Sequence, residues 1–132
     1  MPVIVEQPTV ASTEDFTDLQ KIYQDAPDWL LWPYANANIL IHQALADGSL
    51  LAGRFNGRLL GAALLTKDET HWRLSHLCVR LITRNRGVGR RLLDEARRLA
   101  AEAGQPLHLA APPNNLESQA LAARSGMPLD AL

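Results

Sequence analysis

Cysteine is almost absent from this sequence, since Cys78 is the only one among 132 residues. A single cysteine cannot form an intrachain disulfide or a cysteine-based metal cluster, so both are excluded, and we expect no metal site. Free cysteine without disulfides is typical of a reducing compartment, and the cytoplasm is the simplest candidate.

Long hydrophobic runs and an excess of one charge are also missing. No stretch approaches the roughly 18 apolar residues of a membrane span. Residues 1–8 lack a basic region followed by a long apolar run, so we expect no signal peptide. The 13 basic and 14 acidic side chains give a net charge of −1. This balance gives no reason to expect binding to nucleic acid or to an anionic membrane.

The order of the expected elements predicts an α/β fold in a single domain that spans residues 1–132. The first half has the pattern of antiparallel strands at 2–7, 50–55, 58–66 and 71–80, with helices at 12–26 and 36–47. The second half has the pattern of a helix at 90–103, a strand at 106–110 and a helix at 114–124. A strand, a helix and a second strand in this order predict a parallel crossover. The result is a mixed central sheet flanked by helices.

Two local patterns define the middle strands. Asn56-Gly57 is the favoured pair for a two-residue type I′ turn, because both positions need a positive φ. The apolar residues of the third strand are Trp72, Leu74, Leu77 and Val79. Under strict alternation the first two and the last two fall on opposite faces, and a β-bulge near Ser75 or His76 would resolve this conflict.

A loop rich in glycine and arginine follows this strand. It reads Arg84-Asn85-Arg86-Gly87-Val88-Gly89 and leads directly into a helix. Backbone N–H groups at a helix N-terminus bind anions, and glycines let a phosphate approach the main chain. The flanking arginines favour a pyrophosphate ligand. The loop lacks the Gly-Lys-Ser/Thr of a P-loop and the three-glycine spacing of a dinucleotide-binding loop. A plain surface loop is the alternative, and for Arg90 a solvated helix surface is equally compatible.

Arg84-x-x-Gly87-x-Gly89 after a strand that ends in Leu-x-Val resembles the acetyl-CoA signature of the GNAT acyltransferase family. Asn115 at the start of the last helix and Gly126 at its end resemble that family's last helix. The resemblance implies a GNAT fold that binds acetyl-CoA. The cofactor-binding residues that it implies are Leu77, Cys78, Val79, Arg84, Arg86, Gly87, Val88, Gly89, Arg90 and Asn115. Helix capping explains Asn115 equally well.

Residues 18–22, 52–60, 77–80 and 83–89 resemble, more narrowly, the PanZ family of GNAT-fold proteins. That family binds acetyl-CoA and promotes maturation of the aspartate α-decarboxylase PanD. Its partner contact implies that Arg54, Phe55 and Asn56 bind the decarboxylase here, although the hairpin turn alone also explains Asn56.

Catalytic residues are harder to assign. His76 lies near the strand position where many GNAT enzymes keep a base, and its usual pKa suits proton removal from an amine. A strand histidine with local hydrogen bonds is the alternative. Ala122 occupies the position where many GNAT enzymes carry a tyrosine that protonates the leaving thiolate. The loop with Trp29, Trp32 and Tyr34 has two interpretations. These side chains line an acceptor pocket or a protein interface, or they belong to an ordinary packed loop. Most GNAT domains end in a hairpin, and we expect this hairpin to be short or missing in the present chain.

Two functions therefore stay open. The first is an N-acetyltransferase that moves acetyl from acetyl-CoA to a small amine, with the proton taken by His76 or water. The alternative is a PanZ-like acetyl-CoA-dependent regulator of PanD maturation with little or no transferase activity.

Overall fold

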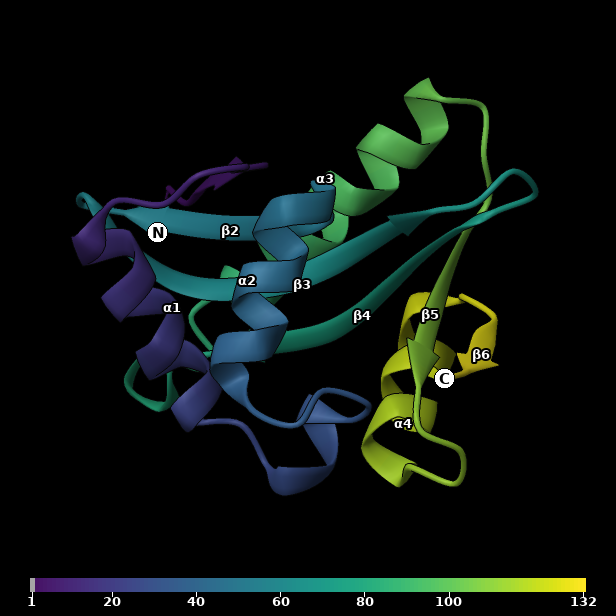
Figure 1. Cartoon of the computed structure of the whole chain (residues 1–132). Coiled ribbons are helices and arrows are strands. Elements are labelled where there is room, and N and C mark those ends of the chain that lie inside the picture. Colours follow the sequence, from purple (N-terminus) through teal and green to yellow (C-terminus); the bar gives the residue numbers. More distant parts are fainter. Residues whose placement is uncertain (1) are drawn as a thin grey trace.

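A mixed sheet in the strand order β1-β2-β3-β4-β5-β6 forms the centre of the structure, a computed structural model that describes residues 2–132 (Figure 1). Strands β1 to β4 pair antiparallel, whereas β5 pairs parallel with both β4 and β6. The strands are β1 (Ile4–Glu6), β2 (Leu50–Phe55), β3 (Arg58–Lys67), β4 (Trp72–Val79), β5 (Leu107–Ala111) and β6 (Leu129–Ala131). The predicted α/β class and mixed sheet are confirmed.

All four predicted helices are present, with ends within about two residues of the predicted bounds. They are α1 (Thr13–Gln24), α2 (Ala37–Asp47), α3 (Val88–Glu102) and α4 (Leu116–Ser125), with short 3-10 helices η1 (Asp28–Leu31) and η2 (Leu81–Thr83). The side chains of Ser12 and Asn36 accept hydrogen bonds from backbone N–H groups in the first turns of α1 and α2. Gly48 and Gly126 end α2 and α4 in the left-handed conformation, which glycine adopts at low cost. No helix among the described residues is long and apolar enough to cross a membrane.

Helices cover the two faces of the sheet, with α1 and α2 on one face and α3 on the other (Figure 1). Leu50 and Ala52 of β2 pack on the α1–α2 side, whereas Leu51 packs on the α3 side. The close approach of α3 depends on Gly61 in β3. A Cβ atom at Gly61 would lie 2.8 Å from Val88 Cγ1. The absence of that atom leaves room for Val88, the first residue of α3, to pack closely on β3.

The β2–β3 turn and the bulge in β4 confirm both local predictions. Asn56 and Gly57 have φ values of 49° and 78°, as a type I′ turn requires. In the β3–β4 ladder, Ala62 pairs with Cys78 but Leu64 pairs with Ser75. Two residues of β4 therefore face one residue of β3, and His76, inside this bulge, has a φ of 55°. The bulge returns the apolar side chains of β4 to the α3 face.

Strands β4 and β5 pair for a short distance and then diverge (Figure 1). Their ladder joins Trp72–Leu74 to Leu107–Leu109 and does not continue along the described part of β4. Strand β6 was not predicted, because the sequence indicated a short or missing final hairpin. Its three residues extend the sheet by pairing parallel with β5.

Candidate functional site

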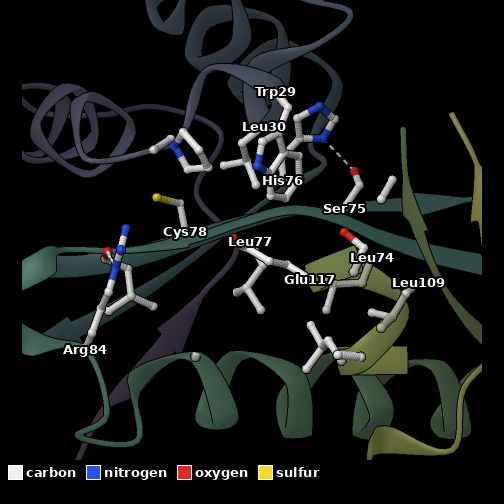
Figure 2. Close-up of a pocket in the computed structure, with 18 of the residues that line it drawn as sticks. Trp29, Leu30, Leu74, Ser75, His76, Leu77, Cys78, Arg84, Leu109 and Glu117 are labelled. Atoms are coloured by element: carbon white, nitrogen blue, oxygen red, sulfur yellow. Dashed lines mark hydrogen bonds between the residues drawn. The ribbon is translucent and has the colours of Figure 1, made fainter. Parts of the chain in front are cut away.

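A cavity of about 1100 Å³ lies where β4 and β5 diverge. Its walls come from β4, β5, the start of α3, the segment around η1 and one side of α4 (Figure 2). The predicted site residues on its lining are His76, Leu77, Cys78, Val79, Arg84, Gly87, Val88, Gly89 and Arg90. The fold thus brings together the β4 residues and the glycine loop.

The N-terminus of α3 forms one end of this cavity. Gly87 precedes the helix with a φ of 90° and has no side chain that could cap it. The first backbone bond of the helix runs from the Arg91 N–H to the Gly87 carbonyl, at 3.0 Å. The N–H groups of Val88, Gly89 and Arg90 therefore lack acceptors within the helix. Together with the helix dipole they form a site for an anion.

Arginines add positive charge at this end. Arg84 donates from Nε to the Val79 carbonyl at 3.1 Å and from Nη2 to the Asp25 carbonyl at 2.9 Å. These bonds fix its guanidinium at the cavity without neutralising it, since no carboxylate of the described chain pairs with it. Arg90 is exposed and lies 4.0 Å from Asp94. Arg124 of α4 also lines the cavity, although the sequence did not single it out.

The main chain of β4 forms the middle of the cavity. The pairing of β4 with β5 ends at Leu74. On the following residues of β4, the backbone groups that face β5 are therefore accessible to a ligand. An extended ligand with amide groups can bind such an edge as an added strand does. Leu74 and Leu77 point toward α3, whereas His76 and Cys78 point to the opposite side (Figure 2). The edge therefore has an apolar wall beside its polar main chain.

Both ring nitrogens of His76 already have partners. Nε2 lies 2.9 Å from the Trp32 carbonyl, which can only accept, so Nε2 carries the proton. Nδ1 lies 2.7 Å from Ser75 Oγ and accepts from that hydroxyl (Figure 2). Burial lowers the pKa of His76, although the Trp32 carbonyl opposes this effect. A neutral imidazole has one acceptor nitrogen, and in this arrangement it is used within the protein.

Other candidate proton donors are also restricted. Burial raises the pKa of the Cys78 thiol, whose Sγ donates to the Ile22 carbonyl at 3.3 Å. Ala122 packs in the core on the α3 side and offers no proton donor. Tyr34 contacts the His76 ring edge-on, at 5.4 Å between ring centroids. Glu117 is the one acidic residue of α4 on the cavity lining, and it was not predicted.

Two of the predicted cofactor residues lie away from the cavity lining in the described structure, namely Arg86 and Asn115. Arg86 is exposed on the loop before α3. Asn115 caps α4, because its Oδ1 accepts from the backbone N–H of Ser118 at 2.9 Å. Their contact with a cofactor stays a prediction. Trp29 and Leu30 do line the cavity, so part of the tryptophan-containing loop forms its wall (Figure 2).

Comparison with protein families identifies the chain. A family described as "Acetyltransferase (GNAT) domain, PanZ" matches residues 2–129. The chain belongs to the PanZ family. A similar protein is the "PanD regulatory factor" of Escherichia coli K12, with 40% identity over 87 residues, which cover 66% of this chain and 60% of that protein. The chain thus matches about three fifths of the length of this relative.

Solved structures show the same fold at low sequence identity. The PaiA N-acetyltransferase of Thermoplasma acidophilum, in complex with coenzyme A, matches with a TM-score of 0.70 and 16% identity, over 95% of this chain and 89% of that one. Ard1 of Thermoplasma volcanium matches with a TM-score of 0.71 and 19% identity, over 96% and 82%. These similarities confirm the GNAT fold of this PanZ-family chain.

The segment expected to bind the partner lies at the β2–β3 turn, outside the large cavity. All five N–H groups of Arg54 bond within the chain, to Glu6, Asp15 and the Gly57 carbonyl. These carboxylates raise the pKa of Arg54. Asn56 is exposed, whereas Phe55 is half-buried. In this PanZ-family chain, Arg54 therefore holds the turn in place, and the exposed residues next to it are the ones that a partner can reach.

Proposed function

We propose that this chain binds acetyl-CoA in the cavity between β4 and β5. The observation that carries the proposal is the uncapped N-terminus of α3, which faces the cavity beside Arg84. A pyrophosphate matches these N–H groups and this guanidinium in charge and in hydrogen-bonding capacity. The coenzyme A held by the structurally similar PaiA acetyltransferase supports the choice of ligand.

The remaining parts of acetyl-CoA also match the cavity. The pantetheine arm is an extended chain with two amides, and it would lie along the open edge of β4 with Leu77 and Val79 beside it. The acetyl thioester would then lie near the bulge, where His76 and Leu77 interrupt the β3–β4 ladder. The pyrophosphate, the pantetheine arm and the thioester thus each have a surface of matching chemistry in the cavity.

The bound acetyl-CoA serves a regulatory function, as the cofactor that enables this chain to act on the aspartate α-decarboxylase PanD. The relatives named PanD regulatory factor support this function. The site chemistry also favours binding over transfer. The acceptor nitrogen of His76 is hydrogen-bonded to Ser75, and the methyl group of Ala122 cannot donate a proton to the leaving thiolate. A reducing compartment such as the cytoplasm suits the free thiol of Cys78.

Acetyl transfer to a small amine is the second candidate. Glu117 and the wall around Trp29 favour it, because they leave polar and aromatic surface in the same cavity for an acceptor. In this case His76 would take the amine proton after releasing the Ser75 hydroxyl, or through a water molecule.

The experiment that tests these functions is a pull-down of the cognate decarboxylase with and without acetyl-CoA, beside an assay of thiol release across a panel of amines. A regulator should retain the decarboxylase only when acetyl-CoA is present and should release thiol slowly or not at all. Rapid thiol release on a defined amine, with no retention of the decarboxylase, would decide for the transferase. Retention that is independent of acetyl-CoA would refute the cofactor's regulatory role.

A further inference from the structure

A cluster of two histidines and one aspartate lies outside the lining of the cofactor cavity. His71 directly precedes β4, His108 lies in β5 and Asp130 lies in β6. The sheet brings them together, because His108 pairs with Arg73 of β4 and Asp130 pairs with Ala110 of β5. The residue before β4 and the neighbouring strands β5 and β6 thus each supply one polar side chain to the same place.

The three side chains converge through their ligand atoms. Asp130 Oδ2 lies 2.8 Å from His71 Nε2, and Asp130 Oδ1 lies 2.9 Å from His108 Nδ1. The two imidazole rings stack with their centroids 4.1 Å apart and an angle of 29° between their planes. One ligand atom from each residue lies within 4.8 Å of the other two.

We propose that His71, His108 and Asp130 form a binding site for a divalent transition-metal ion of the zinc type. Two imidazole nitrogens and one carboxylate oxygen are ligands that zinc accepts, whereas magnesium and calcium prefer oxygen ligands alone. Each of the three side chains is about one quarter exposed, at 25%, 24% and 26% in that order. Water therefore reaches the cluster and can complete a four-coordinate shell.

Admitting an ion requires a local rearrangement of these three side chains. Ligand atoms around tetrahedral zinc lie about 3.3–3.5 Å apart, given bond lengths of about 2.0–2.1 Å. The two contacts to Asp130 would lengthen by roughly half an ångström, and the stacked imidazole rings would turn until both nitrogens point at the ion. Thr70 Oγ1 lies 3.0 Å from His71 Nδ1, so a neutral His71 can donate from Nδ1 to this hydroxyl and present Nε2 to the ion.

No sequence pattern indicates this site, because His71 and Asp130 are 59 positions apart and no local spacing connects them. The expectation of no metal rested on the single cysteine. An ion here would join β6, a strand of three residues, to the start of β4. Since such a site requires the folded sheet, zinc should stabilise the folded chain by mass action.

The experiment is a calorimetric titration of the tag-free chain with zinc chloride at pH 7.5, with magnesium chloride as a comparison. Zinc should bind with a stoichiometry of one and raise the melting temperature, and magnesium should do neither. Asp130→Asn and His108→Gln should each weaken zinc binding at least tenfold. His42→Gln is the matched control, because His42 is exposed on α2, away from the cluster, and its replacement should leave binding unchanged.

A second measurement does not depend on folded variants. X-ray absorption at the zinc edge of the wild-type complex should show two imidazole ligands and further oxygen or nitrogen ligands at about 2.0–2.2 Å. The proposal is overturned if zinc fails to bind with a defined stoichiometry, if the His108 and Asp130 variants bind it as the wild type does, or if the spectrum lacks imidazole ligands.

Discussion

Replacing Gly89 with alanine should separate the stability of α3 from its ability to bind a phosphate. A Cβ atom at this position would lie 3.5 Å from Val79 Cγ2, which is an ordinary van der Waals contact. Alanine is favoured over glycine inside a helix by up to about 1 kcal/mol, so the ligand-free chain should be as stable as the wild type or slightly more stable. Acetyl-CoA binding should weaken, because the new methyl group lies in the first turn, next to the free N–H groups.

The size of this effect follows from the hydrogen bonds at risk. One hydrogen bond to a charged group contributes about 1.5–3 kcal/mol, which corresponds to about a 10- to 150-fold loss of affinity. Thermal unfolding without ligand and calorimetric titration with acetyl-CoA measure the two quantities separately. Gly48→Ala is the matched control with the opposite pattern. Its positive φ at the end of α2 should make alanine destabilising, while affinity should not change. If folded Gly89→Ala binds acetyl-CoA within twofold of the wild type, the pyrophosphate does not lie at the start of α3.

The other tests concern the buried histidine, the β2–β3 turn and the packing beneath α3. Burial lowers the pKa of His76, so its stabilising contribution is complete above its unfolded pKa of about 6.5 and is lost as the pH falls further. In thermal unfolding, the His76→Gln variant should therefore lose less stability between pH 7 and pH 5 than the wild type does, and an equal loss would contradict this. If His76 is also the base of a transferase, the same variant should have a lower rate of acetyl transfer at neutral pH. Asn56→Asp keeps the turn and should weaken decarboxylase binding while acetyl-CoA affinity stays unchanged. Arg54→Ala should weaken decarboxylase binding too, and it should lower the free energy of unfolding by about 1–2 kcal/mol in denaturant, because it leaves the carboxylates of Glu6 and Asp15 unpaired. If the wild type and Asn56→Asp bind the decarboxylase equally, the β2–β3 turn is not part of the interface. Gly61→Ala should cost about 1–3 kcal/mol in the same assay, because its Cβ would lie 2.8 Å from Val88 Cγ1, and unchanged stability would show that α3 can move away freely.

Local features of the fold were predicted from the sequence because the chain determines them over a few residues. Asn56-Gly57 forms its turn through the backbone preferences of these two residues alone. The bulge at His76 follows from a conflict of alternation within one strand. The start of α3 follows from the glycine loop, although the helix begins at Val88, two residues before the predicted start at Arg90.

The remaining features depend on contacts between distant segments. Strand β6 has three residues and is defined by its pairing with β5, so no pattern within it predicts a strand. The role of Arg54 became clear only when the fold placed Glu6 and Asp15 beside it. Glu117 and Arg124 reach the cavity because α4 lies beside the gap between β4 and β5. The hydrogen bonds that occupy both nitrogens of His76 likewise come from the loop at Trp32 and from the bulged strand.

Calorimetric titration of the wild-type chain with acetyl-CoA tests the central claim most directly, with NAD and ATP as comparison ligands. Acetyl-CoA should bind with a stoichiometry of one, and at 100 times its Kd it should stabilise the folded state by about 2.7 kcal/mol in parallel thermal unfolding. NAD and ATP should not match it, because neither carries a pantetheine arm for the edge of β4. The absence of acetyl-CoA binding, or equal binding of NAD or ATP, would contradict the assignment of the cavity.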